Sequence, residues 1–217
     1  MLFESGERII FAGDTVTWCN RSIYGGEGLF DGVGKGYVRM IENLLHIVYP
    51  ENLYWITNAA VQDITSSDMA QNTKKYVPYD SKPAWISIMI GIKDICRRFE
   101  NPCDEHITAE QYRANLRKIL DEALPHVKGG ILISPYFLDT NREDPMRRAV
   151  DEYIEVCREV AREYNLIYVE PQKAFDEFLQ YRHASYISSD RITPGYYGSA
   201  IIAREFLKAV GADRPFV

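Results

Sequence analysis

The sequence contains little that would build a metal centre, a disulfide framework or a membrane span. Its four cysteines, at positions 19, 96, 103 and 157, form no CxxC pair, and no histidine lies at ligand spacing from them. We therefore expect reduced thiols, and neither a bound metal nor a cofactor. The longest apolar stretches are too short to cross a bilayer, and residues 1–8 lack the basic and apolar regions of a signal peptide. A cytoplasmic location is the resulting expectation.

An excess of positive charge is also missing. Lysine and arginine total 25 and aspartate and glutamate total 31, so the formal net charge is −6. This balance argues against a general affinity for nucleic acid or for an anionic membrane. The glycines of residues 25–28 lack the GxGxxG spacing of a dinucleotide-binding loop.

Short apolar runs alternate along the chain with segments of helical period. The runs are too short for typical helices and are hydrophobic almost throughout, which favours parallel strands covered on both faces. They occupy residues 8–12, 53–58, 84–91, 130–134 and 166–170. This alternation predicts one domain, residues 1–217, with a three-layer α/β/α architecture and a five-stranded parallel sheet.

The segments between the runs carry helix signals. One predicted helix has its apolar face at Tyr112, Leu116, Ile119, Leu120 and Ala123, with Thr108 and Gln111 as a capping box. Another begins with Asp144 as N-cap and Pro145 at the first position, a third covers residues 36–46, and the last begins at Pro194. Two long segments, residues 20–33 and 95–105, are predicted loops at the strands' carboxyl ends and form a candidate substrate rim.

Three motifs follow these runs in order. They are Gly13-Asp14-Thr15, Gly91-Ile92-Lys93-Asp94 and Asp190-Arg191-Ile192-Thr193-Pro194. The chain resembles the SGNH or GDSL family of ester and acyl hydrolases, whose corresponding blocks read Gly-Asp-Ser, Gly-x-Asn-Asp and Asp-x-x-His-Pro. Residues 58–63 fall where the family's second block, with its glycine, would lie. The resemblance covers essentially the whole chain and implies a flavodoxin-like SGNH hydrolase fold.

The resemblance also implies a mechanism and its residues. In the family the serine attacks the acyl carbon, the histidine moves the proton, the aspartate orients the histidine, and N–H groups with the asparagine amide stabilise the oxyanion. The serine position is Thr15 here and the aspartate position is Asp190, the two family-equivalent catalytic positions. The glycine, asparagine and histidine positions are Asp63, Lys93 and Thr193, which together with Asp14 we expect to line a binding pocket.

Thr193 is the decisive departure from the family pattern. A threonine hydroxyl does not act as a general base near neutral pH, and losing a triad member costs roughly 10⁴–10⁶ in rate. His46, His106, His126 and His183 offer no obvious substitute, and we interpret His183 as a loop residue with a structural hydrogen bond. Thr193 before Pro194 instead predicts the N-cap of the last helix.

Asp63 and Lys93 replace two neutral residues by an acid and a base. One hypothesis is an ion pair across the former oxyanion hole. The alternative is that both side chains turn to solvent.

Three functions follow from these observations. The first is a protein without serine-esterase activity that binds a small ester or acylated sugar in the former active-site cleft. The second is a working hydrolase that uses Thr15 with an unidentified base. Asp190 acting through water is one candidate base, and Tyr196 and Tyr197 are others, although both are expected to be packing residues. The third is a structural or partner-binding protein.

Overall fold

A five-stranded parallel sheet forms the centre of the computed structural model, which describes residues 1–22, 31–100, 103, 105–212 and 214. The strand order is β2-β1-β3-β4-β5. The bounds are β1 Arg8–Gly13, β2 Trp55–Asn58, β3 Trp85–Met89, β4 Gly129–Ile133 and β5 Ile167–Val169. Each strand lies within, or within one residue of, an apolar run that predicted it, so the expected parallel sheet is confirmed.

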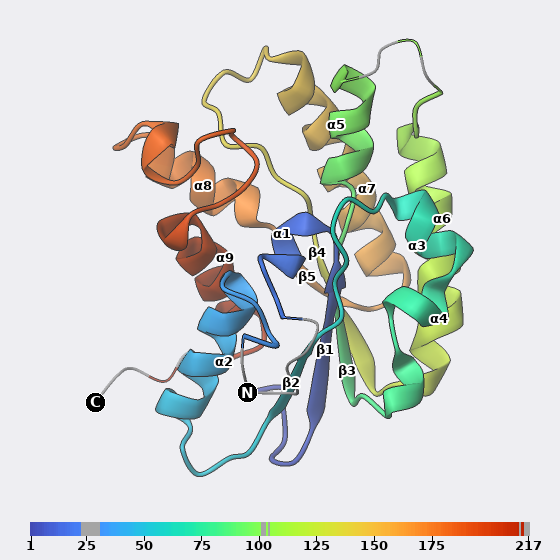
Figure 1. Cartoon of the computed structure of the whole chain (residues 1–217), viewed down its shortest axis with the longest axis vertical. Coiled ribbons are helices and arrows are strands. Elements are labelled where there is room, and N and C mark those ends of the chain that lie inside the picture. Colours follow the sequence, from blue (N-terminus) through green and yellow to red (C-terminus); the bar gives the residue numbers. More distant parts are fainter. Residues whose placement is uncertain (23–30, 101–102, 104, 213, 215–217) are drawn as a thin grey trace.

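Helices cover both faces of this sheet (Figure 1). On one side α2 (Tyr37–Val48) and α8 (Pro171–Leu179) each pack against α9 (Tyr196–Ala209). The other side carries α3 (Ser66–Gln71), α4 (Thr73–Tyr76), α5 (Ile92–Glu100), α6 (Ala109–Ala123) and α7 (Pro145–Glu163). The short α1 (Thr15–Trp18) follows β1 directly. The three-layer α/β/α fold is therefore confirmed.

Two of the predicted helix starts are confirmed. Thr108 and Gln111 form a reciprocal capping box at α6, and the Asp144 side chain accepts a hydrogen bond from the Met146 N–H before α7, whose first residue is Pro145. The side-chain oxygens satisfy N–H groups that have no partner inside a helix.

Two of the predicted segments differ from the structure. Residues 95–100 are helical, because Ile92, Ile95 and Cys96 are buried at the i, i+3, i+4 spacing of one helix face. The last helix begins at Tyr196 with Gly195 as N-cap, so the assignment of Thr193 and Pro194 to its start was wrong. The predicted loop of residues 20–33 lies largely outside the described residues, since positions 23–30 are not described.

The neighbouring carboxyl ends of β1 and β3 fix the place of the site. Gly13, the last residue of β1, pairs with Met89, the last residue of β3. A Cβ atom at Gly13 would lie 2.3 Å from the Met89 carbonyl oxygen, so only glycine fits between the strands. The segments that follow these strands therefore leave the sheet side by side.

Candidate active site

A cavity of about 160 Å³ lies at the carboxyl ends of β1 and β3. All six predicted site residues line it. Its lining consists of Asp14, Thr15, Val16, Asp63, Ile92, Lys93, Cys96, Glu100, Asp190, Ile192 and Thr193. We call this cavity the site pocket. Residues from four separate segments meet in it, which agrees with the rule that ligands bind outside the carboxyl ends of parallel strands.

Thr15 stands at the sharp turn from β1 into α1. The Asp14 side chain caps this turn, accepting a hydrogen bond from the Val16 N–H at 3.0 Å through its Oδ1. The Asp63 backbone N–H donates to the Thr15 Oγ1 at 2.9 Å. One backbone donor therefore already points at the hydroxyl that occupies the nucleophile position.

Asp63 has a left-handed backbone, with φ of 59°. Glycine adopts this conformation without cost, and aspartate is one of the few other residues that adopts it routinely. This explains why the chain carries an aspartate where the family resemblance implies a glycine, and why the backbone N–H still reaches Thr15. The Asp63 carbonyl accepts a hydrogen bond from the Arg97 guanidinium at 3.0 Å, which ties the same turn to α5.

Of the two alternatives for Asp63 and Lys93, the structure shows the ion pair. The Lys93 Nζ lies 3.4 Å from the Asp63 Oδ1 and 3.5 Å from the Glu100 Oε2. The Lys93 side chain is 24% exposed and that of Asp63 is 64% exposed, so the pair lies at the mouth of the site pocket. A pair at this exposure contributes little to stability and mainly places a cation beside Thr15.

Asp190 accepts four hydrogen bonds in the structure. Its Oδ1 accepts from the Ser188 hydroxyl and from the N–H groups of Ile192 and Thr193 at 2.7–2.9 Å, and its Oδ2 accepts from the Thr193 hydroxyl at 2.7 Å. Burial opposes the charge of this carboxylate, but the hydrogen bonds outweigh it and lower the pKa of Asp190. Thr193 is thus bonded to Asp190 rather than capping α9.

Asp14 is the most buried acid of the site pocket. Its Oδ2 has no hydrogen-bond partner among the described residues. Burial, with the nearby charge of Asp94 as a smaller contribution, raises the pKa of Asp14 to about 7 against the opposing hydrogen bond from Val16. A carboxyl at this position binds a proton more readily than an ordinary aspartate.

The described histidines lie away from the site pocket. His183 accepts a hydrogen bond from the Ser185 N–H through its Nδ1 at 3.2 Å and lines a different cavity, which agrees with the structural interpretation of this residue. His126 stacks on Tyr79, and the Nδ1 of His46 lies 3.0 Å from the Glu42 carbonyl oxygen. His106 is likewise absent from the lining of the pocket.

Tyr196 and Tyr197 are exposed to solvent, by 74% and 67%. The prediction that they are packing residues was therefore wrong. They occupy the first turn of α9, where the side chains point away from the apolar face that α9 presents to the core.

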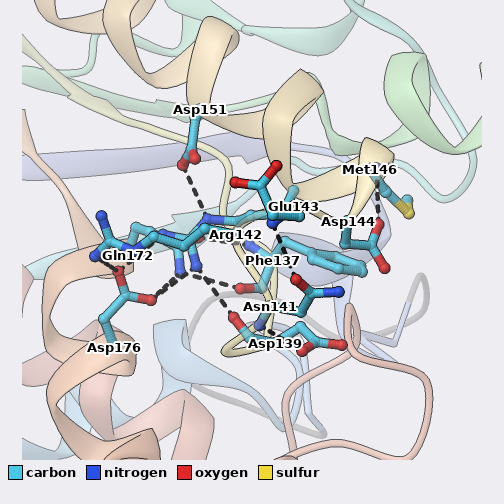
Figure 2. Close-up of polar contacts among 11 residues, drawn as sticks. Phe137, Asp139, Asn141, Arg142, Glu143, Asp144, Met146, Asp151, Gln172 and Asp176 are labelled. Atoms are coloured by element: carbon cyan, nitrogen blue, oxygen red, sulfur yellow. Dashed lines mark hydrogen bonds and ion pairs between the residues drawn. The ribbon is translucent and has the colours of Figure 1, made fainter.

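An arginine network holds the segment that carries Asp190. The Arg191 guanidinium bridges Asp139 and Asp144 at 2.9 and 3.1 Å, and its backbone carbonyl accepts from the Leu138 N–H. The segment of Asp139 and Asp144, both labelled in Figure 2, is fixed in turn by the buried Arg147, whose guanidinium donates to the Asp139 carbonyl at 3.1 Å.

Arg147 is only 3% exposed and is fully paired. It binds both carboxylate oxygens of Asp176 on α8, at 2.8 and 2.9 Å, and also the Asp151 carboxylate and the Asp139 carbonyl. Figure 2 labels these three aspartates. Bidentate pairing of this kind fixes direction as well as distance. The network therefore joins α7 and α8 to the loop that positions Asp190.

Cys96 and Glu100 are two titratable pocket residues that were not among the predicted site residues. They lie three and seven positions after Lys93 on α5, so helical spacing from Lys93 was the signal that would have found them. Burial raises the pKa of the Cys96 thiol to about 12, so it is present as a thiol.

Two further findings concern metals and membranes. Within the described ranges, no group of three or more histidine, cysteine, aspartate and glutamate side chains is arranged to hold a metal ion. No helix among the described residues combines the length and apolar character needed to span a membrane.

Residues 13–201 match the model of the GDSL-like lipase/acylhydrolase family. The chain belongs to this family, as the motifs and the pocket indicate. It is 38% identical over 215 residues to an acetylxylan esterase of Geobacillus stearothermophilus, covering 98% of each chain.

Solved structures agree with this assignment. The crystal structure of Axe2, an acetylxylan esterase from Geobacillus stearothermophilus, has a TM-score of 0.92 at 38% identity, with 97% of each chain covered. LAE5, an alpha/beta hydrolase enzyme from the metagenome of Lake Arreo, Spain, has a TM-score of 0.92 at 37% identity, covering 97% of this chain and 98% of its own.

Mutant structures of Axe2 identify residues of that enzyme. Three catalytic mutants have a serine, an aspartate or a histidine replaced by alanine, and the aspartate and histidine are three positions apart. A further mutant replaces a tryptophan that directly precedes the aspartate.

Proposed function

We propose that this protein binds an acylated sugar in the site pocket and does not hydrolyse it by the serine mechanism of its family. The acetylxylan esterases among its relatives support an acetylated sugar as the ligand class. The proposal treats residues 1–217 as one domain. It assigns ligand contacts to Asp14, Thr15, Asp63, Lys93, Asp190 and Thr193, all of which line the pocket.

The hydrogen bond from the Thr193 hydroxyl to the Asp190 Oδ2, at 2.7 Å, carries the proposal. Asp190 and Thr193 have the three-residue spacing of the catalytic aspartate and histidine of Axe2. The carboxylate that would orient a histidine is here bonded to a hydroxyl. That hydroxyl neither takes a proton from Thr15 nor passes one to a leaving group at neutral pH.

Binding does not require the missing base. The Lys93 ammonium and the Asp63 backbone N–H both lie beside Thr15 and are able to donate to an ester carbonyl oxygen. These donors would hold an acyl group in its ground state. Without a base, however, the Thr15 hydroxyl stays protonated and the acyl carbon is not attacked.

A second candidate function is hydrolysis with Thr15 as nucleophile. The 2.9 Å hydrogen bond between the Asp63 N–H and the Thr15 Oγ1 favours it, because it places a backbone donor where an oxyanion would form. The base would then be Asp190 acting through water. The lowered pKa of Asp190 makes it a poor proton acceptor, which is why we rank this function second.

Calorimetric titration with per-acetylated xylose, followed by an assay for free acetate in the same cell, tests the proposal. We expect saturable binding without acetate release above the buffer control. Lys93→Met should weaken binding by about tenfold, the usual effect of losing one charged hydrogen bond of roughly 1.4 kcal/mol. Lys118→Met, on the exposed face of α6, is the matched control and should bind as the natural protein does.

Two outcomes would overturn the proposal. Acetate release that disappears in Thr15→Ala would establish the second function. No binding at millimolar ester, with Lys93→Met and the natural protein alike, would favour a structural role for the fold.

A further inference from the structure

Two larger cavities adjoin the site pocket on the side of residues 180–195. The nearer, of about 420 Å³, shares Asp190 and Thr193 with the site pocket. The farther, of about 470 Å³, shares Ser185, Ser188 and Ser189 with the nearer one. The three cavities therefore follow one another along the segment between α8 and α9.

Exposed tyrosines line both cavities. Tyr186, which is 61% exposed, lines the nearer cavity, and Tyr181, which is 79% exposed, lines the farther one. A large aromatic side chain left open to water beside a cavity provides an apolar surface for the face of a sugar ring. The Arg182 guanidinium lies 5.8 Å from the centre of the Tyr186 ring and steadies it by a cation–π contact.

The polar groups of these cavities suit a neutral ligand rich in hydroxyls. Ser185 and Ser189 supply hydroxyl groups, and Gln180 supplies an amide. Of the two arginines that line the farther cavity, Arg191 is already paired with Asp139 and Asp144, and Arg182 lies against the Tyr186 ring. An anionic ligand such as a phosphate would have to compete with the two carboxylates for Arg191, whereas a sugar chain would not.

We propose that the two cavities continue the site pocket as a groove for the sugar chain of an acylated oligosaccharide. The ester lies at Thr15, and further sugar units lie over Tyr186 and Tyr181. This inference rests on the proposed function and extends it from a single acylated sugar to a chain.

Ser189 is a small residue at the junction of the two cavities. It lines both cavities and directly precedes Asp190. In Axe2 the residue directly before the catalytic aspartate is a tryptophan. An indole is far larger than a serine side chain, so a tryptophan at position 189 would fill the junction between the two cavities.

The test compares chain lengths by calorimetry, with per-acetylated xylose and acetylated xylotetraose as probes. We expect the tetraose to bind at least tenfold more tightly than the monosaccharide. Tyr186→Ala should remove about tenfold of the tetraose affinity, the effect of losing roughly 50 Å² of apolar surface buried under the sugar. Ser189→Trp should remove a similar share by filling the junction between the cavities. Both variants should leave monosaccharide binding within twofold. Tyr197→Ala removes an equally exposed tyrosine outside both cavities and should change neither affinity.

Equal affinities for the two probes in the natural protein would overturn the groove while leaving the proposed function intact. So would Tyr186→Ala and Ser189→Trp variants that weaken both probes alike. A change of sedimentation coefficient in Tyr186→Ala, without a change in sugar affinity, would instead assign these tyrosines to a protein interface. Unacetylated xylotetraose separates the two proposals. Suppose that unacetylated xylotetraose binds to the natural protein and not to Tyr186→Ala, while per-acetylated xylose binds to neither. This result would support the groove and contradict the binding of an ester in the site pocket.

Discussion

The hydroxyl of Thr193 donates a 2.7 Å hydrogen bond to the Asp190 Oδ2, and the backbone N–H of the same residue donates to the Oδ1 at 2.7 Å. One residue thus bonds both oxygens of the carboxylate. In the family pattern a histidine at this position exchanges a proton while the aspartate orients it. Here the Asp190 carboxylate is instead hydrogen-bonded within a turn formed by residues 190–193.

Thr193→Val removes the hydroxyl but keeps the shape of the side chain. We expect it to lower the free energy of unfolding by about 1 kcal/mol at pH 7. The lowered pKa of Asp190 means that its bonds stabilise the fold above the ordinary aspartate pKa and lose this effect as the pH falls through the lower, folded value. The loss should therefore shrink in acid. Urea unfolding at pH 7 and pH 3 measures it, with Thr193→Ser as the control that keeps the donor. An equal loss at both pH values would contradict the assignment.

The titration of Asp14 makes the stability of the fold depend on pH in the opposite direction. Because burial raises the pKa of Asp14 to about 7, its contribution to stability is fully present below the unfolded pKa near 4 and is lost as the pH rises through 7. Asp14→Asn keeps an oxygen for the Val16 N–H and removes the titration. We expect the variant to gain stability relative to the natural protein between pH 4 and pH 8, at up to about 1.4 kcal/mol per pH unit. Parallel stability curves for the two proteins would show that Asp14 does not titrate in this range.

The left-handed backbone of Asp63 predicts a difference between two substitutions. Asp63→Gly and Asp63→Ala both delete the ion pair with Lys93, but only glycine adopts a φ of 59° without strain. The glycine variant should be more stable than the alanine variant by about 1 kcal/mol. Lys93→Met, which deletes the same pair without touching the turn, should cost less than about 1 kcal/mol. Chemical denaturation measures the free energy of unfolding of the three variants. Equal values for the glycine and alanine variants would contradict a strained backbone at position 63.

Arg147 should be far more important for stability than its neighbour Arg148. Arg147→Met leaves the Asp176 carboxylate, which is 23% exposed, without its bidentate partner. We expect a loss of about 3 kcal/mol or more, as for other broken buried pairs. The Arg148 side chain is 61% exposed, and Arg148→Met should change stability by less than about 0.5 kcal/mol. Similar melting temperatures for the two variants would mean that the buried network does not anchor the loop.

Local signals in the sequence allowed the sheet to be predicted, and the resemblance of the motifs to the SGNH/GDSL family allowed the pocket residues to be predicted. Parallel strands that are buried on both faces have continuous apolar sequences. The carboxyl ends of parallel strands lie at the same edge of the sheet, so motifs that follow these strands lie close together. The opposite charges of Asp63 and Lys93 left an ion pair and solvent-facing side chains as equal alternatives, and only the structure decided between them.

The errors came where two local signals competed. Thr193 and Pro194 have the residue types of a helix start. The Thr193 hydroxyl, however, donates a hydrogen bond to the Asp190 carboxylate, and the helix begins at Tyr196. Residues 95–105 were predicted as a loop although α5 extends to Glu100, because the apolar face of this helix consists of only three buried residues, Ile92, Ile95 and Cys96. Cys96 and Glu100 were missed as pocket residues for the same reason.

Hydrolysis tests the central claim most directly. Acetate release from acetylated xylotetraose should be measured side by side for the natural protein, Thr15→Ala and the double variant Thr15→Ser/Thr193→His. The account predicts that the natural protein and Thr15→Ala release acetate at the same background rate, and that the double variant, which regains a nucleophile and a base beside Asp190, exceeds it. A natural protein that turns over faster than Thr15→Ala would contradict the account.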